Sequence, residues 1–301
     1  MKKNRSLKHP IYWPVWLGMG ILWAVTRLPF SWQIKFGQGL GQLLYLFPSK
    51  LKRVTEINIK LCFPKLTAKE QRRLMKKNFS SIGIGLIETA MAWWLPDKRL
   101  LKLVEIRGLN YPLQAVTKNK GVILLSPHFF CLEIIGRLVS MQYTFTAMYR
   151  PHKKSLIAFI HERFRARYNL SYIPRHKMRT VIDTLSKGQP LWYAYDIDGG
   201  VKRSVFAPFF GIPTASLTAV SRLTQLTGAT VVPVQYYRRE DNKGYQVNFL
   251  PTLENFPSED WQTDATRLNA VLEEAIRNHP EQYIWQYKRF KTRPAGEKRF
   301  Y

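Results

Sequence analysis

Beyond position 100 the chain alternates short apolar runs with stretches of helical periodicity, and this alternation limits what it can fold into. The run 121–126 is the clearest, because five apolar residues precede Ser126, as expected of a strand covered on both faces. We expect strands at 101–106, 121–126, 143–149, 191–195, 229–237 and 245–250, and helices at 134–141, 155–168, 180–187, 216–227 and 264–278. Short strands between such helices predict an α/β fold with a mixed, mostly parallel sheet flanked by helices.

The front of the chain carries a different pattern and is predicted to form an apolar, membrane-anchoring helical segment over 1–35. A basic stretch precedes the apolar run from Ile11 to Val25, which Arg27 closes. A spanning helix needs about 20 residues. The run reaches that length only if it continues to Trp32 and the Arg27 side chain extends to the interface. The segment could span the bilayer, lie in its interface or pack within the domain, and the sequence leaves these three alternatives open. Residues 36–301 are predicted to form one further domain.

Basic and apolar stretches also alternate just after this segment. The apolar segments 36–47 and 82–95 are too short to cross a membrane, and the basic helical stretch 69–77 lies between them. A basic face beside an apolar face is typical of a helix on a membrane surface. A solvated helix face is the alternative for 69–77.

The net charge of +27 comes from 47 Lys and Arg residues against 20 Asp and Glu residues. Such a charge attracts polyanions, including nucleic acid, an anionic membrane with phosphorylated lipid, and an acidic carrier protein. An aromatic content of 14% with nine tryptophans favours the membrane. Since the basic residues are spread along the chain and form no nucleic-acid-binding signature, we expect no nucleic acid partner.

Nucleophilic, nucleotide-binding and metal chemistry find little support in the sequence. The two cysteines, Cys62 and Cys131, form no disulfide framework and fit a reducing cytoplasm. Cys131 is interpreted as a small buried hydrophobe, with a nucleophile as the alternative. No glycine loop of the Walker or Rossmann type and no Cys/His cluster is found, so no cofactor or metal is expected.

The segment Ser126–Glu133 places a histidine and a glutamate five positions apart at the end of a predicted strand. An imidazole accepts a proton near neutral pH, and a carboxylate can fix its tautomer. Five helical residues turn the side chain by about 500°, which leaves the two about 140° apart. The pair therefore meets only if His128 lies before a helix and Glu133 in its first turn. We predict that Glu133 holds His128 as a general base; a glutamate on a solvated face is the alternative.

The chain resembles the lipid A secondary acyltransferases (lauroyl, myristoyl and palmitoleoyl transferases), which belong to the glycerolipid acyltransferase superfamily marked by His-x4-Asp/Glu. The similar motifs occur in order over essentially the whole chain: Ser126–Glu133, Tyr149–Pro151, Leu191–Ala194, Asp196–Asp198, Ser204–Gly211, Gly228–Pro233, Glu281–Trp285 and Arg289–Pro294. The resemblance implies that 36–301 is the catalytic domain and that Arg165 and Asp196 are catalytic together with His128 and Glu133. Arg150 and Asp198 are second candidates, for substrate binding.

The implied reaction moves a fatty acyl chain, lauroyl in the first place, from acyl carrier protein to a hydroxyacyl chain of Kdo2-lipid IVA. The alternatives are a penta-acylated lipid A intermediate, as in a myristoyl transferase, or another lysolipid or glycolipid acceptor. The resemblance implies no metal; a magnesium pair formed by Asp196 and Asp198 is the minor alternative. It also implies the inner membrane as location, with a single N-terminal anchor and the catalytic domain on the cytoplasmic face. The expected partners are the carrier protein, the phosphorylated precursor and the membrane.

Overall fold

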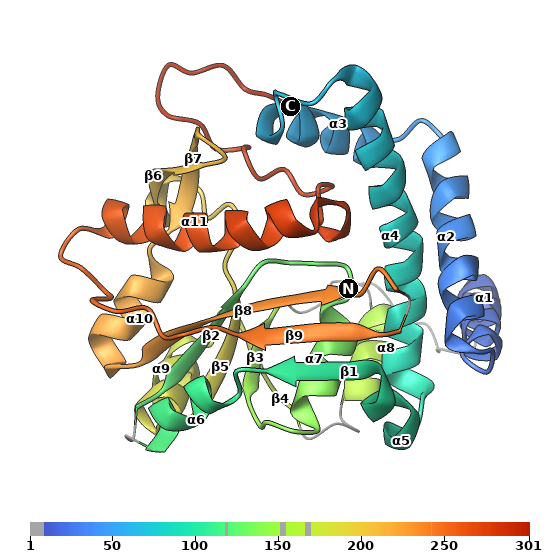
Figure 1. Cartoon of the computed structure of the whole chain (residues 1–301), viewed down its shortest axis with the longest axis horizontal. Coiled ribbons are helices and arrows are strands. Elements are labelled where there is room, and N and C mark those ends of the chain that lie inside the picture. The colour runs from blue at the N-terminus through green and yellow to red at the C-terminus, as the bar shows by residue number, and fades with distance from the viewer. Residues whose placement is uncertain (1–8, 118–119, 151–154, 166–169, 242) are drawn as a thin grey trace.

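A seven-stranded sheet forms the centre of the computed structural model, which describes residues 9–117, 120–150, 155–165, 170–241 and 243–301 (Figure 1). In sheet order the strands are β1 (Val104–Arg107), β9 (Tyr245–Phe249), β8 (Thr230–Arg238), β2 (Val122–Ser126), β5 (Pro190–Ala194), β3 (Thr146–Tyr149) and β4 (Ser171–Pro174). Only β8 and β9 pair in antiparallel fashion; the other neighbours in this described sheet are parallel. The prediction of a mixed, mostly parallel sheet is therefore confirmed.

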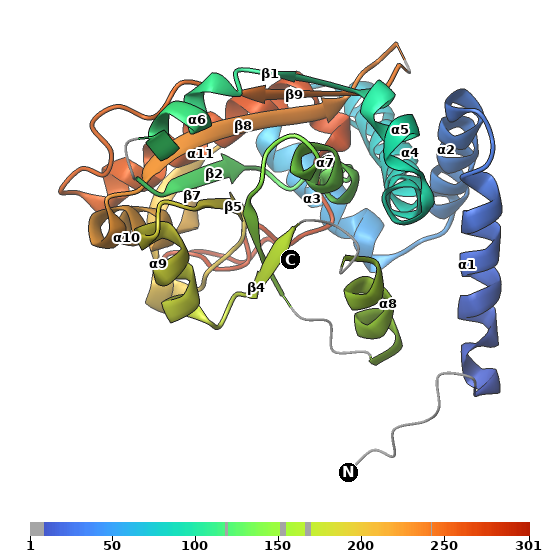
Figure 2. The ribbon, with the colours of Figure 1, turned by 90° about the horizontal axis from the view of Figure 1, so that it is seen from below.

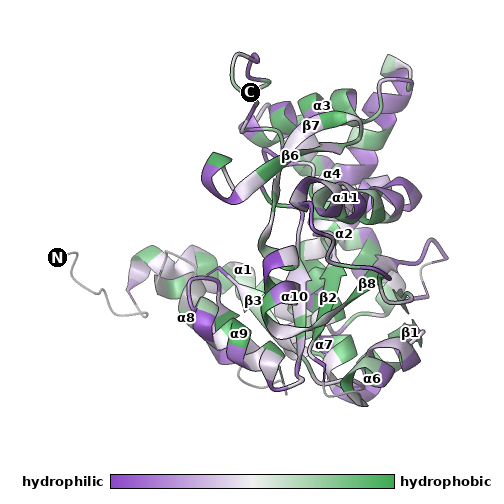
Figure 3. Cartoon of the chain, turned by 90° about the vertical axis from the view of Figure 1, so that its left-hand side faces the viewer, coloured by the Kyte–Doolittle hydropathy of each residue, from purple (hydrophilic) through white to green (hydrophobic). Residues whose placement is uncertain are grey.

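Helices lie on both sides of this sheet (Figures 1 and 2). They are α6 (Asn110–Thr117), α7 (Leu132–Ser140), α8 (Ser155–Arg165), α9 (Met178–Ser186), α10 (Ala219–Thr227) and α11 (Trp261–Asn278). Every residue of β2 is buried, as the uninterrupted apolar run predicts. Figure 3 shows β2 and β8 as largely hydrophobic ribbon in the interior, so the core is built around the central strands.

A small antiparallel hairpin was not among the predicted elements. It consists of β6 (Ser204–Phe209) and β7 (Ile212–Leu217), and it packs against α11. Residues 216 and 217 therefore belong to β7 and Thr218 is the N-cap of α10, so the predicted helix 216–227 begins only at Ala219. The predicted strand 101–106 likewise begins late, at Val104, because Leu101–Leu103 form a 3-10 turn. The predicted helix 155–168 is described as far as Arg165.

In the described residues before the sheet, the α-helices are α1 (Trp13–Val25), α2 (Phe30–Leu46), α3 (Lys50–Cys62), α4 (Ala68–Trp94) and α5 (Asp97–Leu100). The 27-residue α4 joins the basic stretch 69–77 and the apolar segment 82–95 into one helix. A capping box of Thr67 and Glu70 starts it, since each side chain satisfies a backbone N–H of the other. The basic stretch is thus the exposed beginning of a helix that becomes buried further along.

The N-terminal segment does not form one long helix. Helix α1 has 13 residues and ends at Val25, and α2 starts at Phe30 with Pro29 as its N-cap, so the expected continuation from Val25 to Trp32 is interrupted. In the part of the chain that the structure describes, the helices are all too short or too polar to cross a bilayer. The predicted boundary between positions 35 and 36 falls inside α2. Figure 2 shows α1 and α2 at the outer edge of the molecule.

Candidate active site

The site lies where two neighbouring parallel strands end. Strands β2 and β5 pair in register, so that Ser126 lies opposite Ala194. His128 and Asp196 each follow two residues after these paired positions. Because the carboxyl ends of parallel strands meet at the same edge of a sheet, the two side chains are brought together although 68 positions separate them.

One carboxylate holds His128 at two points. Asp196 Oδ1 lies 2.5 Å from His128 Nδ1, and Asp196 Oδ2 accepts a hydrogen bond of 3.0 Å from the backbone N–H of His128. The Asp196 side chain is 2% exposed and the His128 side chain 30% exposed. An ionised carboxylate can only accept, so the ring proton lies on Nδ1 and Nε2 keeps a lone pair. The accessible imidazole is therefore oriented as a base.

Asp196 and His128 each favour the charged form of the other, which opposes the effect of their burial. Burial lowers the pKa of His128, but the charge of Asp196 and its hydrogen bond outweigh this effect and raise the pKa above its ordinary value. Burial raises the pKa of Asp196, and the charge and hydrogen bonds of His128 outweigh it, so the net shift is downward. Asp196 thus stays ionised beside an imidazole of increased basicity.

Glu133 lies in the first turn of α7, as expected, but its described ion pair is with Arg165 of α8. The guanidinium binds it through two bonds, Nε to Oε1 at 3.1 Å and Nη2 to Oε2 at 2.6 Å. The same guanidinium stacks over Tyr172 at 4.5 Å. We predicted Glu133 as the carboxylate that holds the imidazole; in the structure that partner is Asp196. The spacing of five positions can indicate only pairs that are close in sequence, whereas Asp196 follows another strand of the sheet.

A cavity of about 100 Å³ brings His128, Glu133 and Arg165 together. The rest of its lining is mainly apolar and includes Leu132, Phe145, Met148, Leu170 and Trp192. Its volume is below the roughly 300–1,000 Å³ of typical small-molecule sites. It can therefore take the part of an apolar substrate next to the reacting group, but not a long chain.

The loop that carries His128 is held from two sides. The hydroxyl of Tyr236 donates to the carbonyl of Pro127 at 2.5 Å and accepts from the N–H of Phe129 at 3.2 Å. On the other side, the N–H of Ile284 donates to the carbonyl of His128 at 3.2 Å. Tyr236 could not be identified from the sequence, because a tyrosine in an apolar strand carries no pattern that distinguishes a supporting residue from a core residue.

Neither of the two second candidates is among the residues that line this cavity. Asp198 accepts bonds from the N–H of Thr292 at 2.8 Å, from its hydroxyl at 2.9 Å and from the N–H of Gly200 at 2.8 Å. Its carboxylate thus holds the C-terminal segment. Arg150 is exposed at the end of β3; the next residue of its motif, Pro151, lies outside the described residues. Among the described side chains, groups of three or more His, Cys, Asp or Glu arranged to hold a metal are absent.

Cys131 directly precedes α7 and is buried. Burial raises the pKa of its thiol well above the ordinary value, so it carries little thiolate near neutral pH. This environment supports its interpretation as a small hydrophobe.

Comparisons with known proteins cover the whole chain. Residues 1–292 match the family model described as bacterial lipid A biosynthesis acyltransferase. The chain is 38% identical over 296 residues to the lipid A biosynthesis lauroyltransferase of Escherichia coli (strain K12), covering 98% of this chain and 97% of the relative. It is 36% identical over 301 residues to the palmitoleoyltransferase of the same strain, with coverage of 100% and 98%. Identity to the myristoyltransferase of that strain is 26% over 298 residues, with coverage of 98% and 92%.

Proposed function

This chain belongs to the bacterial lipid A biosynthesis acyltransferases, and on that premise we propose that it esterifies a hydroxyl group of a lipid A precursor with a fatty acyl chain from acyl carrier protein. The observation that carries the assignment of the site is the His128–Asp196 pair, whose accessible imidazole borders an apolar cavity. A base of this kind suits an alcohol acceptor, which must lose a proton as it attacks.

In the proposed reaction, Nε2 of His128 takes the proton of the acceptor hydroxyl while its oxygen attacks the carbonyl carbon of the acyl thioester. The C–O bond forms, the C–S bond breaks, and the proton passes from the imidazolium to the departing thiolate. Asp196 stabilises the imidazolium that exists between these transfers. No covalent intermediate on the protein is required, which agrees with the buried Cys131 thiol.

We propose a different part for Glu133 and Arg165. Their bidentate pair lines the cavity next to His128, and two donors of the guanidinium are occupied by Glu133. A guanidinium has five N–H donors, so others remain for the carbonyl oxygen that becomes negative during attack. Glu133 then acts as the residue that positions Arg165.

For the acyl chain we propose lauroyl, and for the acceptor Kdo2-lipid IVA. The identity of 38% to a lauroyltransferase supports this choice over the myristoyl type, at 26%. A palmitoleoyl chain is the competing candidate, because identity to that relative is 36%. Transfer to a penta-acylated intermediate or to another lysolipid or glycolipid would use the same base.

We further propose that the protein acts at the cytoplasmic face of the inner membrane, with α1 and α2 in the membrane interface. Large apolar side chains are exposed along both helices: Trp13, Val15, Trp16, Leu17, Ile21, Trp23, Trp32, Phe36, Leu43, Leu44 and Leu46. Cations accompany them, since Arg27 lies over the Trp23 ring at 4.6 Å and Lys35 over the Trp32 ring at 5.8 Å. Exposed apolar residues with basic neighbours are typical of interfacial helices.

The test is an acyl transfer assay with carrier protein bearing labelled chains of 12, 14 or 16 carbons. The wild type should acylate Kdo2-lipid IVA, with the 12-carbon chain preferred, and His128→Ala should lose nearly all of this activity. Near-normal transfer by His128→Ala would refute the proposed base. Transfer only to a penta-acylated lipid or a lysophospholipid would replace the proposed acceptor.

A further inference from the structure

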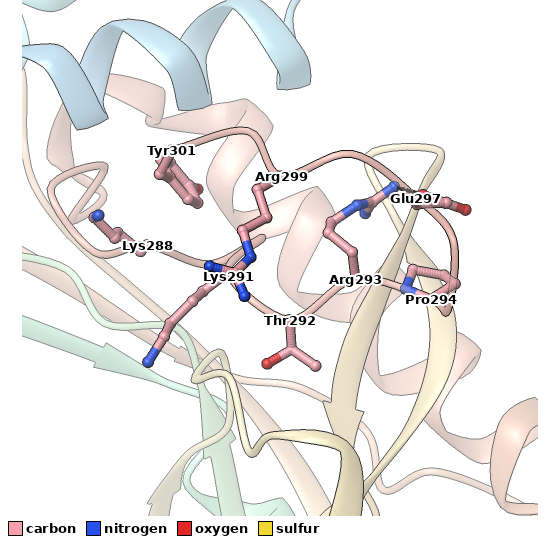
Figure 4. A pocket seen from close by; sticks show the side chains of 8 residues that line it. All are labelled: Lys288, Lys291, Thr292, Arg293, Pro294, Glu297, Arg299 and Tyr301. Carbon is pink, nitrogen blue, oxygen red and sulfur yellow. Dashed lines mark hydrogen bonds and ion pairs between the residues drawn. The ribbon is translucent and has the colours of Figure 1, made fainter.

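The C-terminal segment after β9 and α11 forms a second pocket outside the cavity beside His128. This C-terminal basic pocket is lined by Lys288, Lys291, Thr292, Arg293, Pro294, Glu297, Arg299 and Tyr301, and its volume is about 450 Å³ (Figure 4). The volume lies within the roughly 300–1,000 Å³ of small-molecule sites.

The charge of the pocket is only partly neutralised by the protein. Arg293 pairs with Glu297 and donates to the carbonyl of Pro213. Among the described residues, the ion pairs include none for Lys288, Lys291 or Arg299. These three cations share one concave surface, where like charges repel each other. An anion bound there would relieve that repulsion.

A second hollow extends the basic surface. It has a volume of about 220 Å³, shares Lys288 and Tyr301 with the C-terminal basic pocket, and adds Lys50 and Arg53 of α3. The two hollows together are lined by six cations, of which Arg293 is paired with Glu297, and the second also contains the apolar Val54 and Ile57. A phosphorylated group with a larger, partly apolar body fits this combination better than a small free ion does.

Thr292 connects the C-terminal basic pocket to the loop after β5, which carries Asp196 and Asp198. Thr292 lines the pocket, and its N–H and hydroxyl both donate to Asp198. Asp198 follows Asp196 by two residues, which span at most about 7 Å of extended chain. The Thr292 part of the pocket is thus tied to the edge of the sheet at which β2 and β5 end, where His128 also lies.

We propose that the C-terminal basic pocket binds a phosphate group on the sugar headgroup of the lipid acceptor, so that the acceptor hydroxyl is positioned at His128. This inference rests on the proposed function. Phosphate recognition needs clustered Arg and Lys donors on a concave surface, which these residues supply. A phosphate group concentrates its charge and its acceptor oxygens in one place, which suits clustered donors better than carboxylates distributed over a protein surface do.

The test compares the wild type with the double variant Lys291→Gln/Arg299→Gln. We expect the KM for the phosphorylated acceptor to rise roughly tenfold or more, the effect of losing one or two charge-assisted contacts. The KM for the acyl carrier protein substrate should stay within about twofold, since each exposed charge contributes little to a protein–protein contact. With an acceptor freed of phosphate by a phosphatase, the difference between the variant and the wild type should disappear.

The matched control is Lys120→Gln/Lys187→Gln, which removes two exposed charges at the opposite edge of the sheet, before β2 and β5. It should keep the KM of the wild type for both substrates. A rise in the KM for the carrier protein alone would overturn the proposal in favour of a carrier site. An equal loss with phosphorylated and dephosphorylated acceptor would overturn it as well.

Direct binding separates this proposal from the proposed function. The phosphorylated lipid in detergent micelles is titrated with His128→Ala, with and without the double variant, so that no turnover is needed. The double variant should bind it roughly tenfold more weakly or worse, whether or not the wild type transfers lauroyl chains. If the double variant weakens only the binding of inorganic phosphate and not of the lipid, the pocket is a free-phosphate site and the headgroup assignment is wrong.

Discussion

The imidazole of His128 is fixed through both its ring and its backbone by Asp196. Oδ1 meets Nδ1 and Oδ2 accepts the backbone N–H, so the side chain cannot rotate without breaking the first contact. Tyr236 and Ile284 fix the same loop from either side. In the proposed reaction, an imidazole held in this way would lose little entropy when an acceptor binds, as efficient proton transfer requires.

Replacement of Asp196 by Asn should change both the rate and its pH dependence. The variant loses the charge that raises the pKa of His128, whereas the burial that lowers it remains. The neutral, active form of His128 then persists to lower pH, so the acid limb of kcat/KM should move to lower pH. The maximal rate should fall by about 10²–10⁴, because the amide no longer stabilises the imidazolium. Rates measured between about pH 5 and 9 cover the titration.

Glu133→Gln is the matched control for this prediction. Glu133 is paired with Arg165 rather than with the imidazole, so its replacement should reduce the rate without moving the acid limb. If Glu133→Gln moved the acid limb as far as Asp196→Asn, or if Asp196→Asn left it in place, the assignment of Asp196 as the partner of His128 would be wrong.

Helices α2 and α4 approach each other closely because glycines form their contact. A Cβ atom at Gly41 would lie 2.0 Å from the carbonyl oxygen of Phe79, and one at Gly83 would lie 2.1 Å from that of Gly37. No side chain fits at these distances. By contrast, a Cβ at Gly39 of the same helix meets nothing within 4 Å. The contact joins the outer helices to the helix that packs on α7.

Gly41→Ala should therefore lower the free energy of unfolding by about 1–3 kcal/mol, as expected for overpacking. Gly39→Ala should raise it by up to about 1 kcal/mol, because alanine favours a helix where space is free. Denaturant unfolding of both variants and the wild type measures the difference. Equal stability of the two variants would contradict the close contact between α2 and α4.

The predictable elements were those whose pattern is local. The apolar run of β2 and the alternation around it indicated the sheet, and the helix after His128 was expected near its observed place. The hairpin of β6 and β7 was missed, because its pairing depends on contact with α11 and not on alternation. The family motifs pointed to Arg165 and Asp196 as candidates, but Glu133 rather than Asp196 was expected to contact His128. Only the order of strands in the sheet places Asp196 beside it, and strand order is a property of the tertiary structure.

The positions of the exposed apolar side chains and of the basic side chains bear on how the molecule would bind a lipid acceptor. Helices α1 and α2, which carry many of the exposed apolar side chains, lie at one edge of the molecule (Figure 2), and the basic surface of the C-terminal segment includes Lys50 and Arg53 of α3, the helix that follows α2. A lipid acceptor combines acyl chains with a phosphorylated headgroup, so it would use both regions. The net charge of +27 adds attraction to an anionic bilayer.

Membrane binding through α1 can be tested with one substitution and a closely matched control. Leu17 on α1 is 68% exposed and Leu226 on α10 is 69% exposed, so a glutamate at either position replaces the same apolar surface. Leu17→Glu should weaken binding to anionic vesicles about tenfold or more, since burial of a leucine contributes about 1.5–3 kcal/mol. Leu226→Glu, which changes the net charge equally, should bind within about twofold of the wild type because surface charges act weakly in salt. Vesicle flotation at two salt concentrations measures both. Equal weakening by the two variants would mean that charge alone holds the protein at the membrane, and α1 would then have no part in the interface.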